Sequence, residues 1–373
     1  MDIQVREIKT KKELWKFIRF PQRLYSGNDY YTPPIFSSEL KTLSSDKNPA
    51  FEFCNCKLWL AYKEGKIVGR IAGIINNNYN EQHKIRNARF GWLDFIEDED
   101  ILNSLLIAAE NWARENNMEY IHGPLGFTSF DASGILIEGF KEIPASFAHY
   151  NYPYYSELIE KNGYIKDIDW IEFKIKVPQK VPDKIRRGAR IIKQKYNLHA
   201  VKEKTTRGLK RYVKDLFNII NITYKDFYGF SELTAKQSKL LEKDFLSLLN
   251  PEFVSLVVDQ HDKLIAFGIS LPSLSKAVKK SKGRLFPFGY FRIYRALHKN
   301  DKVDLLLIAI DPNYQNKGIN AIIFDDLMQV FIDKKIIDVE TTRELEDNIK
   351  VQQLWKDYES IQHNRVRCYI KKL

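Results

Sequence analysis

The sequence predicts an α/β protein with two consecutive domains, each a mixed sheet flanked by helices. The length of 373 residues is enough for two domains of ordinary size. Hydrophobic residues make up 44% and charged residues 29% of the chain, which is a globular composition. Each half repeats one order of patterns: a hairpin, then strand, helix, strand, helix and strand. That order is typical of a mixed sheet covered by helices.

The first half contains the first copy of this order. Two apolar runs around a Glu64-Gly65 turn predict a hairpin over residues 58–74. Apolar residues recur at helical spacing over 98–116 and predict an amphipathic helix. The other expected elements are strands over 89–95 and 120–122, a long loop, a helix over 154–161 and a closing strand over 170–177.

The second half contains the second copy. Its hairpin is expected over 253–271, with a turn at 261–263. An apolar stripe over 319–331 predicts the main helix. The remaining elements are strands over 304–310, 337–341 and 365–371 and a helix over 348–358.

Two prolines, Pro178 and Pro182, disfavour regular structure between the copies. Apolar residues at Ile185, Ala189 and Ile192 indicate an amphipathic helix just after them. We therefore predict a first domain over 1–177, a basic linking segment over 178–211, and a second domain over 212–373 that opens with a helix over 212–224.

The net charge of +11 is unevenly distributed. Residues 176–214 carry 14 bases and two acids, and residues 276–302 carry nine bases and one acid. Such local basic segments suggest a local anionic partner. Aromatic residues are interleaved with the second segment, and we expect them to be buried over the cofactor or the cleft between the domains rather than to form a nucleic-acid or membrane surface. They are Phe286, Phe288, Tyr290, Phe291 and Tyr294.

Several patterns favour a cytoplasmic protein without a membrane partner. The longest apolar run, 305–310, is far shorter than the roughly 20 residues that cross a bilayer. The N-terminus contains acidic residues and no apolar core, unlike a signal peptide. Cys54 and Cys56 lie in an apolar strand pattern and predict structural thiols. The scattered histidines form no metal-ligand cluster, so no metal is expected.

Residues 305–321, LLLIAIDPNYQNKGINA, are the most informative stretch. A buried strand ends at Asp311-Pro312, a short loop follows, and a helix begins near Gly318. Backbone amides and the helix dipole converge at such a loop and favour an anion. Gly318 lets the backbone approach a bulky ligand, and Lys317 adds a positive charge. The stretch therefore predicts a pyrophosphate site.

Residues 311–320 resemble the coenzyme A loop of the GCN5-related N-acetyltransferase superfamily, whose pattern is Gln/Arg-x-x-Gly-x-Gly/Ala. Asn320 replaces the final small residue of that pattern. Asn348-x-x-Val351-x-x-Leu354-Trp355 resembles the superfamily's Asn-x-x-Ala-x-x-Leu-Tyr helix. Motifs along nearly the whole chain resemble an uncharacterised bacterial family of tandem acetyltransferase-like proteins, among them Val68-Gly69-Arg70-Ile71, Gly123-Pro124-Leu125 and Gly283-Arg284-Leu285.

This resemblance implies that acetyl-CoA or another acyl-CoA binds in the second domain, with Asn348 near the pantetheine arm. In the first domain the equivalent stretch, 95–100, has four carboxylates, which would repel a pyrophosphate. Its loop 123–134 and its tyrosines over 150–155 either complete an acceptor pocket against the second domain or pack between the domains. The expected cofactor-binding residues are Ala309, Ile310, Gln315, Asn316, Lys317, Gly318, Ile319, Asn320 and Asn348.

Acyl transfer to an amine needs a base, a donor to the thioester carbonyl and a proton for the thiolate. A backbone amide near Ala309 or Ile310 is the expected donor. Glu340 and Glu346 are candidate bases by motif position, with surface ion pairs or helix capping as the alternative role. Trp355 occupies the usual position of the acid, but an indole cannot protonate a thiolate, so Tyr358 is the candidate acid.

The predicted function is an acyl-CoA-dependent N-acyltransferase, acting on a small amine or similar nucleophile. One alternative is a non-catalytic acyl-CoA-binding or scaffold protein, which Trp355 favours. The other is an aminoacyl transferase of the peptidoglycan-bridge type, whose transfer RNA the basic residues 176–214 would track. A complete coenzyme loop argues against the transfer RNA donor.

Overall fold

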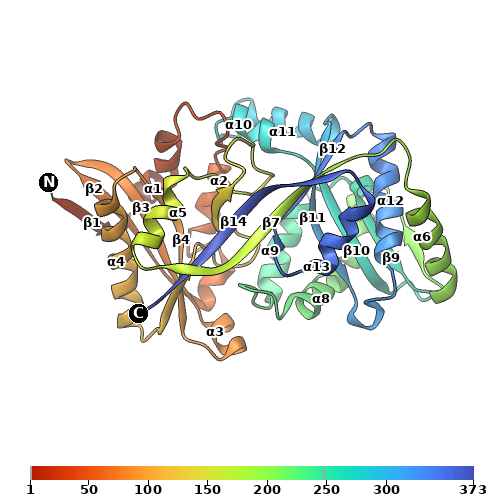
Figure 1. Cartoon of the computed structure of the whole chain (residues 1–373), viewed down its shortest axis with the longest axis horizontal. Helices are drawn as coiled ribbons and strands as arrows, with labels where there is room; N and C mark the ends of the chain where they lie inside the picture. The colour runs from red at the N-terminus through yellow and green to blue at the C-terminus, as the bar shows by residue number, and fades with distance from the viewer. Residues whose placement is uncertain (1, 247) are drawn as a thin grey trace. The chain divides into compact units, whose positions relative to one another are not determined.

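The computed structural model describes residues 2–246 and 248–373 (Figure 1). The chain divides into two units. Unit 1 comprises Met1–Ile171, Ser275–Ile293 and His363–Leu373, and unit 2 comprises Glu172–Leu274 and Tyr294–Gln362. The units therefore exchange segments along the chain, whereas consecutive domains were expected. The boundaries at 177/178 and 211/212 stay predictions for independently folding domains.

Unit 1 contains a mixed sheet with the order β1-β2-β3-β4-β5-β14, and β6 also pairs with β14. The pairs are antiparallel except for β4 and β5, which are parallel. The predicted hairpin is confirmed, since Glu64 and Gly65 join β2 and β3 with φ of 52° and 73°. The strands are β1 (Ile3–Glu7), β2 (Cys54–Lys63), β3 (Lys66–Asn76), β4 (Asn87–Phe95), β5 (Tyr120–Gly123), β6 (Ile135–Glu138) and β14 (Ser360–Lys372).

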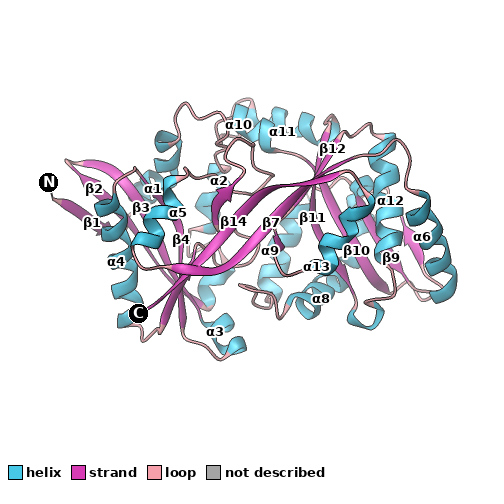
Figure 2. Cartoon of the chain, in the orientation of Figure 1, coloured by secondary structure: helices cyan, strands magenta, loops and turns pink. Residues whose placement is uncertain are grey.

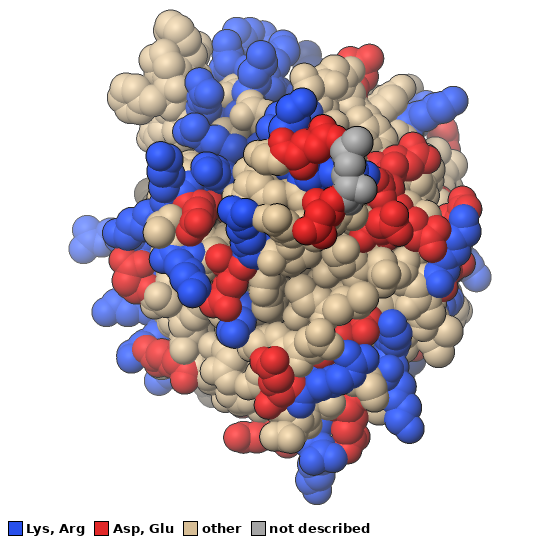
Figure 3. All heavy atoms as spheres, turned by 90° about the vertical axis from the view of Figure 1, so that its left-hand side faces the viewer, with Lys and Arg blue, Asp and Glu red and all other residues tan. Residues whose placement is uncertain are grey.

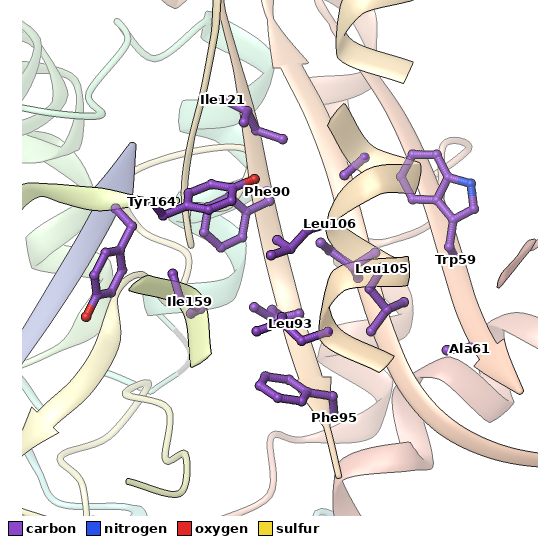
Figure 4. Close-up of a cluster of buried hydrophobic side chains, with 14 of the residues drawn as sticks. Trp59, Ala61, Phe90, Leu93, Phe95, Leu105, Leu106, Ile121, Ile159 and Tyr164 are labelled. Carbon is purple, nitrogen blue, oxygen red and sulfur yellow. The ribbon is translucent and has the colours of Figure 1, made fainter. Parts of the chain in front are cut away.

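Helices pack against the sheet of unit 1, as Figure 2 shows. Helix α4 (Glu99–Glu115) matches the predicted amphipathic helix, and its apolar face packs on β3 and β4. Figure 4 shows this core, in which Leu105 and Leu106 lie opposite Phe90 and Leu93. The other helices of this unit are α1 (Lys11–Leu24), α2 (Phe36–Thr42), α3 (Asn77–His83), α5 (Tyr154–Lys161) and α10 (Ser275–Lys280), with a 3-10 turn at Pro49–Glu52.

The sheet of unit 2 has the order β7-β12-β11-β10-β9-β8, and β13 also pairs with β7. Strands β11 and β12 are parallel, and the other neighbours along this order are antiparallel. Strand β7 begins five residues before the predicted start at 170. The strands are β7 (Ile165–Lys176), β8 (His199–Val201), β9 (Val254–Val258), β10 (Leu264–Pro272), β11 (Lys302–Ile310), β12 (Asp338–Thr341) and β13 (Glu344–Leu345).

Helix α12 (Asn320–Asp333) carries the predicted apolar stripe into the core of unit 2, where Ile322, Ile323 and Leu327 are buried. The predicted helix over 348–358 is shorter, because α13 (Ile349–Gln352) passes into a 3-10 turn, Gln353–Asp357. The remaining helices are α6 (Asp183–Tyr196), α7 (Thr206–Leu209), α8 (Val213–Tyr224), α9 (Ala235–Leu246) and α11 (Gly289–His298), with 3-10 turns at Lys210–Tyr212, Pro251–Phe253 and Pro312–Tyr314. Helix α11 begins in unit 1 and ends in unit 2.

The aromatic segment over 284–298 differs from expectation. Phe286, Phe288, Tyr290, Phe291 and Tyr294 are all exposed, so the prediction that they are buried is wrong. Apolar character alone did not decide burial here. Helix α11 buries Gly289 and Ile293 and exposes Tyr290, Phe291 and Tyr294, while Phe286 and Phe288 lie exposed in the segment before it. Within residues 2–246 and 248–373, none of the helices has both the length and the apolar character needed to cross a membrane.

Candidate functional site

The end of strand β11 lies at an opening in the sheet of unit 2. Register between β11 and β12 ends at the Leu305–Thr341 pair. Thr342 then donates its amide to the Leu305 carbonyl and its hydroxyl to the Leu306 carbonyl, both at 3.1 Å. Pairing of β11 with β10, however, continues to Ile310. The last residues of β11 therefore have a strand partner on one side only among the described residues.

The two candidate amides at this opening point in different directions. The amide of Asp311 donates to the Ile265 carbonyl of β10 at 2.8 Å. Because backbone groups alternate sides along a strand, the amide of Ala309 faces β10 and that of Ile310 faces away from it. The carbonyl of Ile310 accepts from the Thr223 hydroxyl of α8 at 3.4 Å, which agrees with this orientation. The amide of Ile310 thus faces the side on which Thr223 and Tyr224 of α8 bond the Ile310 and Ile308 carbonyls.

The loop after β11 has a backbone conformation that curves around a point. Asp311 accepts a hydrogen bond from the amide of Asn313 at 2.9 Å and fixes a 3-10 turn, Pro312–Tyr314. Two residues then adopt positive φ, Asn316 at +59° and Gly318 at +77°. Alternation of left-handed and other conformations turns successive amides toward one side and forms an anion-binding concavity.

The amides of residues 316–320 donate no hydrogen bond to any acceptor in the described part of the chain. The first helical amides that are paired are those of Ala321 and Ile322, at 3.0 and 2.9 Å. Ile319, at the N-cap of α12, provides no side-chain hydrogen bond. Five consecutive unpaired amides therefore lie at the positive end of a helix of 14 residues.

Cationic side chains lie beside these amides. The ammonium of Lys317 lies 4.9 Å from the ring centroid of Tyr314 and 5.3 Å from that of Tyr196. The Lys350 ammonium of α13 lies 3.4 Å from the side-chain oxygen of Asn316. The segment over 315–320, named here the α12 cradle, therefore combines free donors with positive charge.

Glycine is favoured at position 318 of the α12 cradle. An alanine at 318 would adopt a left-handed conformation that side chains disfavour, and its Cβ would lie 3.3 Å from Ile192 of α6. Gln315 donates its side-chain amide to the Ile310 carbonyl at 3.3 Å and so ties the cradle to the end of β11.

The equivalent helix start in unit 1 is already occupied. Asp98 accepts hydrogen bonds from the amides of Asp100 and Ile101 at 3.0 and 3.3 Å, which caps α4. Its carboxylate also accepts from the Lys63 ammonium at 2.7 Å, and both contacts lower the pKa of Asp98. The negative charge and the missing free amides make this helix start unsuited to a pyrophosphate.

The opening beside β4 in unit 1 is also filled by its own chain. The Phe90 carbonyl accepts from the amide of Leu125 at 2.8 Å. Tyr154 donates its hydroxyl to the Phe95 carbonyl at 2.6 Å, and the Tyr155 hydroxyl accepts from the Phe95 amide at 3.2 Å. Tyr155 is fully buried. This part of the tyrosine cluster is thus internal packing of unit 1.

Of the predicted carboxylates, Glu340 is fully buried in β12, and its contact with Lys302 is the ion pair of the alternative role at a buried position rather than at the surface. Burial raises its pKa to about 7, although Lys302 in contact with it opposes the rise. The Lys174 ammonium lies 4.0 Å away. Asp304 is its partner across the parallel pair of strands.

Glu346, Asn348 and Tyr358 follow β13. Glu346 and Asn348 are half-buried, and Asn348 is the N-cap of α13 without a side-chain capping bond. Tyr358 lies just beyond the 3-10 turn with extended backbone, so the helix expected over 348–358 does not reach it. Its hydroxyl has no hydrogen-bond partner among the described residues, and burial raises its pKa. Functional roles for these residues stay predictions.

Glu344 is a candidate that the sequence analysis missed. It begins β13, three residues after the β11–β12 pairing ends at Thr341. Burial raises its pKa to about 7, against the effect of a hydrogen bond from Trp355. That bond runs from the Trp355 indole nitrogen to the carboxylate at 2.9 Å. No sequence motif marked Glu344, and only its place between strand and Asn348 could have suggested it.

The basic linking segment is largely paired with acids. On α6, Lys184 contacts Asp357 at 2.9 Å, and Arg186 contacts Asp325 of α12 at 3.5 Å. Among the described residues, seven of the 14 bases over 176–214 form such pairs: Lys176, Lys180, Lys184, Arg186, Lys193, Lys202 and Arg211. A solvated face with ion pairs therefore accounts for much of its charge.

Two curated proteins are similar to this chain. Protein YghO of Escherichia coli K12 is 26% identical over 383 aligned positions, which cover 99% of this chain and 95% of that protein. A protein of Caulobacter vibrioides named bacterial ceramide synthase is 26% identical over 298 positions, covering 78% of this chain and 76% of that protein. No protein-family model matches the sequence.

Solved structures share the fold. A tandem GNAT protein from the clavulanic acid biosynthesis pathway matches with a TM-score of 0.57 and 11% identity, covering 100% of this chain and 98% of that one. A GCN5-related N-acetyltransferase from Sphaerobacter thermophilus matches with a TM-score of 0.51 and 9% identity, covering 99% and 95%. As its sequence predicted, the chain therefore has the tandem fold of the GCN5-related N-acetyltransferases.

Proposed function

We propose that unit 2 binds acyl-coenzyme A at the α12 cradle and transfers its acyl group to an amine. The observation that carries this proposal is the row of five unpaired amides over 316–320, at an uncapped helix start beside Lys317. A diphosphate offers both acceptor oxygens and negative charge to such a site. The shared fold supports acyl transfer as the class of reaction.

The bound cofactor would supply an activated acyl thioester. The amide of Ile310 faces the opening beside β11 and would donate to the thioester carbonyl oxygen, where negative charge develops. Ala309 faces β10 instead, so of the two expected donors Ile310 suits the role. Its own carbonyl is already bonded to Thr223, which fixes the direction of this peptide unit.

Glu344 is our proposed base for the acceptor amine. Its pKa of about 7 leaves a substantial fraction ionised at neutral pH, which suits proton acceptance there. The indole of Trp355 orients the carboxylate through the 2.9 Å hydrogen bond. Glu340 touches Lys302 in the sheet, and this contact favours charge compensation for that residue. Glu346 remains a second candidate base.

Tyr358 remains the candidate acid for the leaving thiolate. Its hydroxyl lacks a hydrogen-bond partner among the residues described, so its proton is not committed elsewhere. The indole of Trp355 is committed to Glu344 and cannot act as the acid. Trp355 therefore acts as a positioning residue in this scheme.

The acceptor is proposed to be an amine. The name of the Caulobacter relative denotes a protein that forms a ceramide, which is an amide of a fatty acid. That product class agrees with acyl transfer to nitrogen. An aminoacyl donor on transfer RNA is less well supported, because seven of the 14 bases over residues 176–214 are already paired.

The test is thiol release from acetyl-CoA and from long-chain acyl-CoAs by the full chain, over a panel of amines. We expect release that depends on the amine, with kcat at least tenfold lower in Glu344→Gln. Lys317→Glu should raise the KM for acyl-CoA at least tenfold, because it reverses the charge beside the cradle. Lys141→Glu, at an exposed lysine of unit 1, is the matched control and should leave KM unchanged.

Two results would overturn the proposal in different ways. Tight coenzyme A binding without thiol release from any donor would favour the non-catalytic alternative. Equal KM values in Lys317→Glu and Lys141→Glu would remove the α12 cradle as the cofactor site.

A further inference from the structure

The segment between α10 and the first turns of α11 exposes an unusual set of aromatic side chains. Phe286 is 86% exposed, Phe288 66%, Tyr290 70% and Phe291 65%. Apolar side chains of this size are normally buried, and a contiguous exposed group marks an interaction surface. Three of the four are phenylalanines, whose rings carry no polar group that could form a hydrogen bond with water.

Cations surround these rings. Lys280, Lys282, Arg284 and Arg292 line a hollow of about 430 Å³ together with Phe286 and Phe288. In the part of the chain that the structure describes, no carboxylate lies within 4.0 Å of these four cations. Arg292 donates to the Lys280 carbonyl at 2.8 Å, which holds α11 against the end of α10. The hollow is therefore a cationic site with apolar walls.

Figure 3 shows lysine and arginine side chains gathered near the upper edge of the face in view, beside uncharged side chains that protrude. Lower on the same face, acidic and basic side chains are mixed.

The segment is held firmly on unit 1. The Gly283 carbonyl accepts from the amide of Phe36 at 3.0 Å, and the Ser275 hydroxyl donates to the Pro144 carbonyl at 2.8 Å. An added Cβ at Gly283 would lie 2.4 Å from the Pro34 carbonyl, so only glycine allows this approach. The exposed rings are thus presented from a fixed base, and binding needs little further ordering.

We infer that this segment, named here the α10–α11 patch, docks on the surface of a bilayer that contains anionic lipids. The phenylalanines would enter the boundary between headgroups and acyl chains, and the four cations would contact phosphate groups. Apolar rings next to lysine and arginine are the pattern of a peripheral membrane contact. The sequence had suggested no membrane partner, and this inference concerns contact with one leaflet, independently of the reaction in unit 2.

Two other occupants fit the patch less well. Nucleic acid would use the cations and could stack on rings, but phenylalanines that project from the surface offer hydrocarbon burial more than base stacking. A second copy of this chain would bring a second patch of the same positive charge to a symmetric contact, and like charges repel. An anionic lipid surface complements both the charge and the apolar rings.

The test is co-sedimentation of the full chain with vesicles of phosphatidylcholine alone or mixed with phosphatidylglycerol. We expect binding to the mixed vesicles that weakens as salt is added. The Phe286→Ser/Phe288→Ser variant should bind about 100-fold more weakly, about tenfold for each phenylalanine removed from the lipid. Lys282→Gln/Arg284→Gln should bind about 25-fold more weakly, about fivefold for each charge.

The matched control is Ile165→Ser/Ile361→Ser, which removes two exposed apolar side chains outside the patch. It should bind vesicles as the wild type does. All substituted side chains are exposed, so each variant should keep the wild-type melting temperature, which confirms that it is folded.

Three results would overturn the inference. One is that the wild type does not bind the mixed vesicles, or that the wild type and the phenylalanine variant bind them equally strongly. Another is that a single-stranded oligonucleotide binds tightly, that its binding requires the same phenylalanines, and that it displaces no vesicle from the protein. The third is a concentration-dependent dimer in sedimentation velocity that the phenylalanine variant abolishes while vesicle binding persists.

Discussion

Glu344→Gln should change how the stability of the protein depends on pH. The substitution keeps the size of the side chain and an oxygen that can accept from Trp355, but it removes the titration. Burial raises the pKa of Glu344 from its ordinary 4.5 to about 7. Because one pKa unit corresponds to about 1.4 kcal/mol, the two states of the protein differ by up to about 3 kcal/mol in proton affinity at this site.

Whether stability rises or falls with pH depends on which state, folded or unfolded, holds the proton of Glu344 more tightly. Here the folded state does, so the stabilisation is complete below about pH 4.5 and is lost as the pH rises to about 7. The glutamine cannot lose a proton. The free energy of unfolding of the wild type should therefore fall by about 3 kcal/mol relative to Glu344→Gln between pH 4.5 and pH 8.

The assay is urea unfolding of both proteins at several pH values. Differences between variant and wild type cancel the titration of all other groups. Glu157→Gln is a control of opposite sign, since Lys161 lowers the pKa of that exposed carboxyl. A difference between Glu344→Gln and wild type that stays constant across this pH range would refute the reasoning.

Two further predictions concern single contacts. Trp355→Phe removes the indole hydrogen bond to Glu344 and should destabilise the protein by about 1–3 kcal/mol, read from urea unfolding. The alkaline rise of thiol release should also move to higher pH, and an unchanged pH profile would show that the indole does not act on the carboxylate. Asp98→Ala removes the cap of α4 and the ion-pair partner of Lys63, so the free energy of unfolding should fall by about 1 kcal/mol. Coenzyme A affinity, measured by calorimetry, should stay unchanged. Weaker coenzyme A binding would contradict the assignment of the cofactor to unit 2.

The elements of the fold were predictable where one period dominates the sequence. The hairpin around Glu64-Gly65, helix α4 and helix α12 all have clear periodicity with turn or cap residues at their ends, and the structure has them within a few residues. Local rules sufficed there, because propensity, apolar pattern and turn chemistry agree.

The exchange of segments between the units was not predictable from local patterns. Residues 275–293 belong to unit 1, although they follow a strand of unit 2 in the sequence. What holds them there is backbone contact, such as the Phe36 amide on the Gly283 carbonyl at 3.0 Å. A backbone hydrogen bond over such a sequence separation leaves no trace in composition or periodicity.

Local sequence patterns likewise predicted only part of the candidate site. Lys317 and Gly318 were identified because a strand, a loop and a helix start leave a local signature. Glu344 was missed because its importance depends on burial and on a contact with Trp355, 11 residues away. The direction of the Ile310 amide likewise depends on pairing between β10 and β11, which sequence alone does not orient.

The most direct test of the central claim is calorimetric titration of coenzyme A into the wild type, Gly318→Ala and Gly27→Ala. Both glycines have positive φ, +77° and +85°, so alanine imposes similar backbone strain at each, about 1–2 kcal/mol. No atom lies within 4 Å of the added Cβ at Gly27, which makes it a matched control for strain. We predict that Gly318→Ala weakens coenzyme A binding at least tenfold and that Gly27→Ala binds as the wild type does. Equal affinities in all three proteins, or no binding by the wild type, would contradict the assignment of a diphosphate to the amides beside Gly318.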